Sequence, residues 1–178
     1  MRHNIELSYE NIKLTSIRLE DIDKLRSWRN NAELTPYLSK IDYITKDMQL
    51  AWYNKDLENQ DCYSFAIYET QELQSVIGSV ALYNFNGNTA EFGRLLIGDI
   101  KARGKGYGYL ATILCLQIGF NQFNLDEIIA YVFEENIAAV KAYKKAGFKI
   151  LGKDDKDELK ISITKEDFIK YGGELCLQ

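Results

Sequence analysis

The chain of 178 residues contains only one histidine, His3. A Ser-His-Asp triad, a Cys-His pair or an H-E-x-x-H zinc site would each place a histidine at the reaction centre. His3 stands in an N-terminal segment that we expect to be frayed. The sequence therefore argues against triad-type hydrolases and zinc proteases, and we expect no metal site.

Cysteines are also few. Cys62, Cys115 and Cys176 are far apart, and no C-x-x-C pair exists, which excludes a zinc knuckle and a thioredoxin-like centre. Cys115 lies in an apolar run, so we expect it to be a small core residue. This usage is typical of a reduced cytoplasmic protein. The first residues also lack the apolar segment of a signal peptide, so we expect a cytoplasmic location.

An excess of basic charge is missing as well. There are 22 Lys and Arg residues against 26 Asp and Glu residues, a net charge of −4, which argues against a nucleic-acid partner. The longest uncharged stretch, 107–125, is interrupted by Gln117, Asn121, Gln122 and Asn124. It therefore predicts a helix buried in a protein core, and no membrane partner is expected.

No repeat, linker or low-complexity tract divides the chain, so the sequence predicts a single domain over 1–178. Periodicity and turn residues predict an α/β protein with the order β-α-α-β-β-β-α-β-α-β-β. Thr45 is expected to cap a helix that buries Met48 and Trp52. The predicted strands are 12–17, 62–69, 76–83, 91–97, 128–133, 148–152 and 158–164, and the predicted helices are 20–30, 45–59, one starting near 107, and 136–146.

A glycine-rich loop between a predicted strand and a predicted helix is the most informative segment. It reads Lys-Ala-Arg-Gly-Lys-Gly-Tyr-Gly-Tyr over 101–109. Glycines let several backbone amides turn toward one point, and the start of a helix adds positive potential. We therefore infer a site for a phosphate-bearing cofactor. Neither the P-loop nor the G-x-G-x-x-G spacing fits, and a solvated glycine-rich turn is the alternative.

Two motifs together resemble the GNAT superfamily, the Gcn5-related N-acetyltransferases. Arg103, Gly106 and Gly108 fill the fixed positions of that family's pyrophosphate loop. A later segment matches the family's Asn-x-x-Ala-x-x-x-Tyr-x-x-x-Gly-Phe helix through Asn136, Ala139, Tyr143, Gly147 and Phe148. The proline that many members carry just before the glycine loop is missing.

The resemblance implies a mixed, mostly antiparallel central sheet of about seven strands, with helices on both faces and the fourth and fifth strands splayed apart. It also implies acetyl-CoA as the acetyl donor, with its pantetheine arm along the fourth strand. The residues expected to bind this cofactor are Leu96, Ile97, Arg103, Gly104, Lys105, Gly106, Tyr107, Gly108, Asn136 and Ala139.

By the same resemblance, Tyr143 is the general acid that protonates the departing CoA thiolate, or else a buried tyrosine of the core. Glu91 is the expected general base, acting directly or through water. Its alternative is an exposed carboxylate at a strand end, and Glu134 and Glu135 are the next candidates. Asn136 caps its helix or contacts the cofactor.

Arg94 is a charge within an apolar strand and needs a partner. It binds an anionic part of the substrate, or it forms an internal ion pair. The two early helices form the acceptor wall in this family and carry Trp28, Arg29, Trp52 and Tyr53, although the core is the simpler place for Trp28 and Trp52.

The expected activity is transfer of an acetyl group to a primary amine by direct attack in a ternary complex. Segment 25–30 resembles ribosomal-protein N-terminal acetyltransferases of the RimJ/RimL type. Segment 90–98 resembles relatives that acetylate amino sugars linked to nucleotides, and we favour such a small acceptor. The alternatives are a protein N-terminus as acceptor and a non-catalytic module that binds acyl-CoA. The chain is expected to be a monomer or a homodimer.

Overall fold

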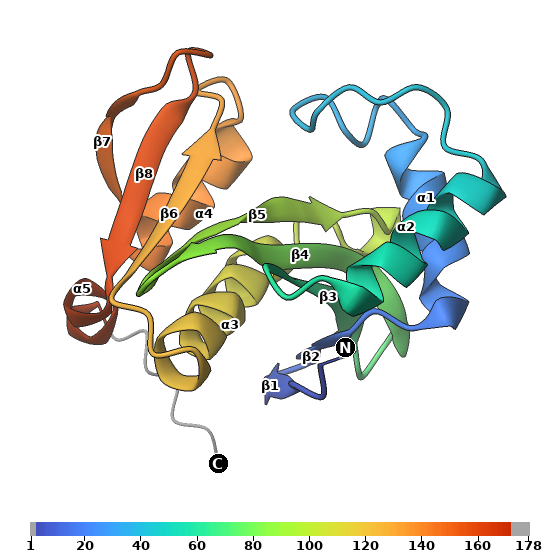
Figure 1. The fold of residues 1–178 in the computed structure, drawn as a ribbon, viewed down its shortest axis with the longest axis horizontal. Helices are drawn as coiled ribbons and strands as arrows, with labels where there is room; N and C mark the ends of the chain where they lie inside the picture. Colours follow the sequence, from blue (N-terminus) through green and yellow to red (C-terminus); the bar gives the residue numbers. More distant parts are fainter. Residues whose placement is uncertain (1–2, 172–178) are drawn as a thin grey trace.

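A computed structural model of the protein describes residues 3–171. One sheet of eight strands runs in the order β1-β2-β3-β4-β5-β6-β8-β7 (Figure 1). Among the strands of residues 3–171, only β5 and β6 pair in parallel. The strands are β1 Leu7–Tyr9, β2 Ile12–Ser16, β3 Cys62–Glu69, β4 Ser75–Asn86, β5 Thr89–Ile97, β6 Glu127–Val132, β7 Lys149–Lys153 and β8 Leu159–Thr164. The helices are η1 Leu19–Asp21, α1 Ile22–Arg29, α2 Lys46–Glu58, η2 Ile100–Ala102, α3 Tyr107–Gln122, α4 Ile137–Ala146 and α5 Lys165–Lys170.

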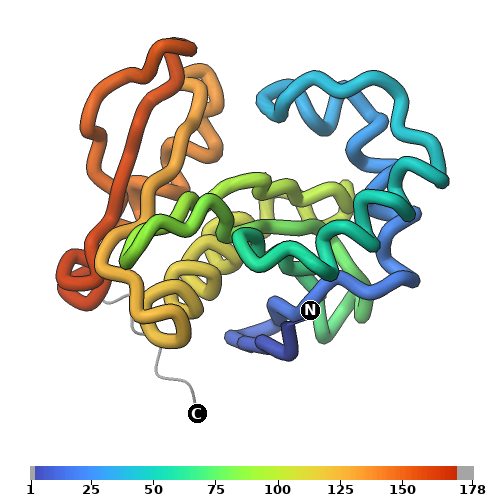
Figure 2. Tube along the Cα trace, viewed as in Figure 1, coloured from blue at the N-terminus to red at the C-terminus, as the bar shows by residue number. Residues whose placement is uncertain are grey.

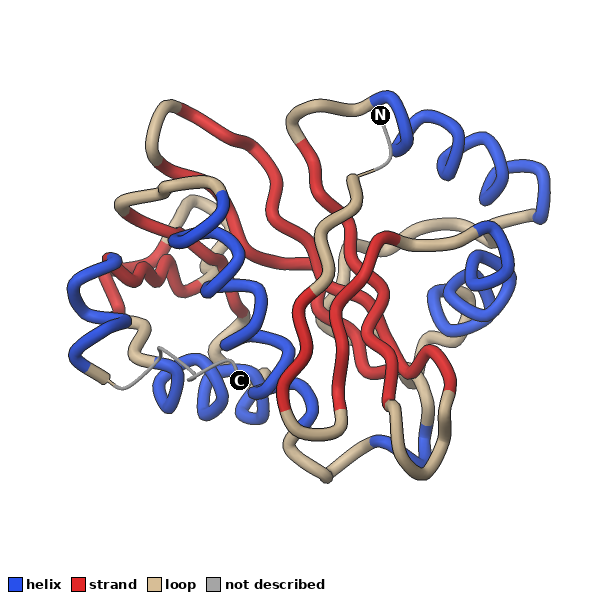
Figure 3. Tube along the Cα trace, turned by 90° about the horizontal axis from the view of Figure 1, so that it is seen from below, coloured by secondary structure: helices blue, strands red, loops and turns tan. Residues whose placement is uncertain are grey.

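Each face of the sheet packs on its own helices, because side chains alternate between the faces along a strand. In β3, Phe65 and Ile67 enter the larger core beneath α3, whereas Ala66 belongs to a smaller core beneath α1 and α2. Figure 3 shows the strands in red between these two groups of helices. The mostly antiparallel sheet with helices on both faces is thus confirmed, with eight strands in place of about seven.

Strands β5 and β6 pair only at one end. Their ladder consists of Thr89 with Glu127, Ala90 with Ile128 and Glu91 with Ile129. Beyond Glu91 the two strands run into separate halves of the molecule, as the tube in Figure 2 shows. The carboxyl ends of β5 and β6 therefore form the two walls of an opening in the sheet.

Strand β5 carries a bulge just after this point. The register with β4 changes from Ala81 opposite Gly93 to Ser79 opposite Leu96, so Arg94 and Leu95 together face a single residue of β4. Arg94 has a φ of 54°, a left-handed conformation that is uncommon for a residue with a side chain. Bulges re-aim side chains next to functional sites, and here the side chain is a guanidinium.

Several local signals behave as the sequence predicts. The Thr45 hydroxyl accepts the Met48 N–H at 3.2 Å at the start of α2, and Gly147 ends α4 with a φ of 100°. Strands β7 and β8 pair with each other, and Cys115 is fully buried. Among the described residues, no helix has the length and apolar content that a membrane span requires.

The predicted inner face of α2 is wrong. Met48 is 50% exposed and Trp52 is 37% exposed, whereas Gln49 and Tyr53 are buried. Apolar side chains are spread around α2, so its sequence does not mark one inner face. Strand β1 and helix α5 also went without a signal in the sequence, because they are only three and six residues long. His3 is not frayed, since its ring packs 4.7 Å from that of Phe65.

Candidate active site

A groove of about 440 Å³ lies in the opening between β5 and β6, and we call it the central groove. Helix α4 and the segment between α1 and α2, residues 30–45, complete its walls. It brings together residues from both sequence motifs and from β5. The predicted site residues that line it are Arg94, Leu96, Ile97, Arg103, Gly104, Gly108, Asn136, Ala139 and Tyr143.

One end of the central groove is formed by the glycine-rich loop. Gly104 and Gly106 have φ angles of 76° and 83°, and a Cβ added to either would meet no atom within 4 Å. Gly106 is the N-cap of α3, so the free amides and positive end of that helix open onto this space. The loop therefore offers a cradle that fits a pyrophosphate.

Arg103 connects this loop with a distant segment. Its guanidinium donates to the Ile97 carbonyl at 3.0 Å and to the Leu34 carbonyl at 3.2 Å. Ile97 ends β5, and Leu34 belongs to the α1–α2 segment. Arg103 thus ties the loop of one motif to the wall on the other side of the groove.

Two residues of the loop point elsewhere. The Lys105 ammonium is 2.7 Å from the Glu72 carboxylate, and the ring of Tyr107 is buried with its hydroxyl accepting from Asn11 at 2.8 Å. Neither side chain lines the central groove. For Tyr107, only the backbone N–H at the start of α3 remains as a means of contacting a bound anion.

Helix α4 supplies the opposite wall. The Asn136 side chain accepts the Ala139 N–H at 3.3 Å, so it caps the helix while also lining the groove. Tyr143 is buried, and its ring meets the Phe92 ring edge-on with 5.5 Å between centroids. Burial raises the pKa of the Tyr143 hydroxyl above its usual value, so the hydroxyl keeps its proton at neutral pH.

Glu91 stands at the last paired position before β5 and β6 separate. Burial, followed by the nearby negative charge of Glu91 and a hydrogen bond to it, raises the pKa of Tyr83 to about 12. Glu91 itself does not line the central groove. Tyr83, its neighbour across the β4–β5 ladder, had no signal in the sequence that set it apart from other strand tyrosines.

Three other glutamates near the central groove make different contacts. Glu134 forms an ion pair with Lys153 at 3.2 Å, and the backbone carbonyl of Glu135 accepts the Tyr37 hydroxyl at 3.0 Å. Glu158 lines the central groove, and burial raises the pKa of its carboxyl. The sequence did not indicate a role for Glu158, because it stands among other charged residues at a hairpin turn.

A second cavity, of about 470 Å³, lies between the sheet and the α1–α2 layer, and we call it the arginine cavity. Arg94, Leu96 and Leu38 line both this cavity and the central groove, so the two spaces meet there. Its apolar lining includes the exposed side chains of Met48 and Trp52. Met48 and Trp52, which were predicted to be buried in the core, thus line a cavity instead.

Two guanidinium groups face this cavity without a carboxylate partner. Arg29 donates to the Ser39 carbonyl at 3.2 Å, and Arg94 lies 4.3 Å from the centre of the Tyr83 ring. Burial, and then the charge of Arg94, lower the pKa of Arg29. Within residues 3–171 no carboxylate lies within salt-bridge distance of either arginine, and none lines the cavity. The internal ion pair considered for Arg94 is therefore not found.

Trp28 lies in the smaller core. It is buried, and its ring presses on Gly98, where an added Cβ would come within 2.0 Å of Trp28 Cδ2. Trp28 lines neither the central groove nor the arginine cavity. The structure thus places Trp28 in the core and not at the expected substrate position, because α1 needs a large side chain to fill the space over Gly98.

Comparisons with known proteins agree with this architecture. Residues 11–149 match the family described as "Acetyltransferase (GNAT) domain". Acetyltransferase PseH of Campylobacter jejuni is 24% identical over 153 residues, which are 86% of this chain and 92% of that protein. Spermidine N(1)-acetyltransferase of Escherichia coli is 27% identical over 145 residues, 82% and 76% of the two chains. The crystal structure of the Vibrio cholerae spermidine N-acetyltransferase in complex with CoA and spermine superposes with a TM-score of 0.79 at 22% identity, covering 89% of this chain and 98% of that one.

Proposed function

Because the chain belongs to the GNAT acetyltransferase family, whose acetyl donor is acetyl-CoA, we propose that it acetylates the primary amine of a small acceptor that carries an anionic group. The observation that supports this acceptor class is the arginine cavity, which is lined by two guanidiniums without a carboxylate partner and meets the central groove at Arg94. The donor would occupy the central groove and the acceptor the arginine cavity. Their meeting point at Arg94 and Leu96 would bring amine and thioester together.

We expect the donor to bind through backbone groups that have no partner strand or helix. The pyrophosphate is held by the amides of Gly104, Gly106 and Gly108 with the start of α3. The pantetheine arm runs along the edge of β5 beyond Glu91, where no ladder to β6 is formed, and bonds to it like an added strand. A backbone N–H near Leu96 or Ile97 then polarises the thioester carbonyl.

The chemical step needs one base and one acid. An alkyl amine is mostly ammonium at neutral pH, so Glu91 takes one ammonium proton, directly or through water. The free amine attacks the thioester carbon, the C–S bond breaks, and Tyr143 donates a proton to the leaving thiolate. The nitrogen then loses a second proton, which returns Tyr143 to its neutral form through water, and Glu91 releases the first proton to solvent, so one proton leaves per amide formed.

The charge of the cavity separates two kinds of small amine. The E. coli relative is named for spermidine and the V. cholerae protein was crystallised with spermine, and both of these polyamines are cations. In this chain the cavity offers two cationic groups and no carboxylate, so a polyamine would be repelled and an anion attracted. The hydrogen bond from Tyr37, which lines the central groove, to the Glu135 carbonyl joins the α1–α2 segment to the loop after β6, and this link favours a small acceptor over a protein N-terminus.

The first test is thermal unfolding with acetyl-CoA, CoA, ATP and NADH in parallel. At about a hundred times the Kd, binding should stabilise by about 2.7 kcal/mol, and we expect that only acetyl-CoA and CoA raise Tm. The shift should be lost in Arg103→Glu, because the reversed charge faces the pyrophosphate. No shift with either CoA compound would overturn the assignment of the donor.

The acceptor class is tested by CoA release with a matched pair, glucosamine 6-phosphate and glucosamine, and with spermidine. A charge-assisted pair contributes about 1.5–3 kcal/mol, so kcat/KM should favour the phosphorylated amine by roughly 10-fold or more. Arg94→Ala should remove this preference, whereas Arg18→Ala, which loses an arginine outside both cavities, should keep it. A preference for spermidine would disprove the anionic acceptor.

A further inference from the structure

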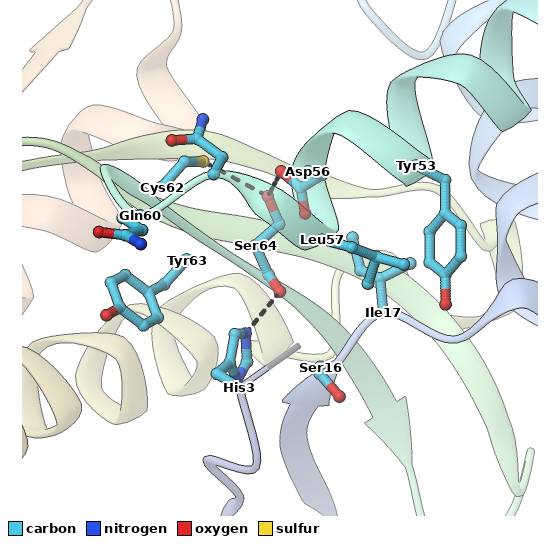
Figure 4. A pocket seen from close by; sticks show the side chains of 11 residues that line it. His3, Ser16, Ile17, Tyr53, Asp56, Leu57, Gln60, Cys62, Tyr63 and Ser64 are labelled. Atoms are coloured by element: carbon cyan, nitrogen blue, oxygen red, sulfur yellow. Dashed lines mark hydrogen bonds between the residues drawn. The ribbon is translucent and has the colours of Figure 1, made fainter. Parts of the chain in front are cut away.

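A chain of polar side chains leads away from Arg94 behind the arginine cavity. The Arg94 guanidinium donates to Cys62 Sγ at 3.3 Å, Cys62 Sγ lies 3.5 Å from Ser64 Oγ, and Ser64 Oγ donates to an Asp56 carboxylate oxygen at 2.9 Å. Figure 4 shows the last two of these contacts. Asp56 comes from α2, while Cys62 and Ser64 come from β3. Of these four residues, only Arg94 was singled out by the sequence.

The Ser64–Asp56 hydrogen bond limits what the thiol of Cys62 can do. The hydroxyl of Ser64 has one proton, which goes to the Asp56 carboxylate. The thiol of Cys62 therefore donates to the oxygen of Ser64 or to Asp56, and in both cases the sulfur is left to accept from Arg94. Burial raises the pKa of the Cys62 thiol, so it keeps the proton that this arrangement requires.

The chain joins a cation to an anion through two neutral groups. The charge of Arg94 is among the influences that lower the pKa of Asp56, although burial outweighs them and the pKa is raised overall. His3 and Cys62 are the other titratable groups that act on Asp56. Asp56 lines neither the central groove nor the arginine cavity, but a separate cavity of about 350 Å³ that includes Ser64.

We propose that Asp56 is a positioning residue for acceptor recognition, which holds the Arg94 guanidinium at the mouth of the arginine cavity through Ser64 and Cys62. This inference rests on the anionic acceptor of the proposed function. An exposed arginine on a bulge otherwise samples many rotamers, and ordering such a side chain costs conformational entropy. A guanidinium that is ordered in advance spares the acceptor that cost.

The test uses inorganic pyrophosphate as an anion probe, titrated calorimetrically into protein saturated with CoA, so that the glycine-rich loop is already filled. We expect Asp56→Ala, Ser64→Ala and Cys62→Ala each to weaken pyrophosphate binding by about fivefold to tenfold, because each interrupts the ordering of Arg94. Cys62→Ser restores a donor and an acceptor and should stay within about twofold of wild type. Asp47→Ala, an exposed carboxylate on the same helix, is the matched control.

Kinetics separates positioning from a general loss of structure. With glucosamine 6-phosphate, KM for the acceptor should rise in the interrupted variants while kcat and KM for acetyl-CoA stay unchanged. Equal effects of Cys62→Ser and Cys62→Ala, or an unchanged affinity in Asp56→Ala, would overturn the proposal. Asp56→Asn, which keeps an acceptor oxygen without the charge, should give an intermediate affinity and covers the case that Asp56→Ala does not fold.

The two proposals fail in different ways. If the wild type transfers acetyl groups to an anionic amine and Asp56→Ala binds pyrophosphate normally, only the positioning role is wrong. If pyrophosphate does not bind the CoA-saturated wild type at all, the anion site is wrong and the positioning role falls with it. If pyrophosphate binding weakens in the Asp56, Ser64 and Cys62 variants, the positioning role is supported even before an amine substrate has been found.

Discussion

The central groove and the arginine cavity meet at Arg94, but they are built by different means. In the central groove, the part proposed for the donor relies on backbone groups: the edge of β5, the amides of the glycine-rich loop and the start of α3. The arginine cavity is made of side chains that α1, α2, β3 and β5 bring together from distant parts of the sequence. A backbone site tolerates changes in side chains, so one donor can serve a family while acceptors differ among its members.

The largest expected effect breaks the chemistry of the central groove without altering its shape. Tyr143→Phe keeps the ring that packs on Phe92 but removes the acidic proton. Loss of a general acid costs about 100-fold or more in kcat. The KM for acetyl-CoA and the Tm should remain close to wild type, as measured by CoA release and thermal unfolding. A variant that retains the full kcat would show that Tyr143 is not the acid.

A smaller effect is expected in the smaller core, where Trp28 of α1 packs on the residue that follows β5. Gly98→Ala places a Cβ against the Trp28 ring, and overpacking of this kind costs typically about 1–3 kcal/mol. Denaturant unfolding should show this loss. In a Trp28→Leu background the same substitution should cost much less, because the ring is gone. Equal losses in both backgrounds would mean that the Trp28 contact does not fix the glycine.

The smallest expected effect is a pH-dependent change in stability caused by the partly buried charge of Asp56. Burial raises the folded-state pKa of Asp56 above its ordinary 3.8, so its charged form destabilises the folded protein. That destabilisation is present above the folded-state pKa and disappears as the pH falls through it. Asp56→Asn should therefore unfold at a slightly higher Tm than wild type near pH 7.5, and the difference should vanish on acidification. A lower Tm at pH 7.5 would show that the carboxylate stabilises the fold.

The contrast also explains how much the sequence could predict. The glycine-rich loop and the Asn136 helix are local patterns, so spacing and caps were enough to place them on the correct elements. The exposed Met48 and Trp52 were expected in the core, because helical periodicity cannot distinguish a residue that faces a cavity from one that faces a core. The sequence marked Arg94 as unusual, but it did not predict the β-bulge that sets the direction of its side chain.

The polar chain lay beyond sequence reasoning for a different reason. Asp56 precedes Arg94 by 38 positions, and their connection depends on the register of β3, β4 and β5 together. Nothing in the local sequence marks Cys62 as more than a buried thiol. Such contacts follow only from tertiary structure, which is also why they suit a specificity that differs between relatives.

The α1–α2 segment has a consequence for the timing of a catalytic cycle. Two hydrogen bonds hold this segment. The Leu34 carbonyl accepts from the Arg103 guanidinium, and the Tyr37 hydroxyl donates to the Glu135 carbonyl. Both hydrogen bonds join the segment to residues beside the other walls of the central groove. We expect the donor to enter and spent CoA to leave past this segment, so that each turnover breaks and re-forms the same two hydrogen bonds.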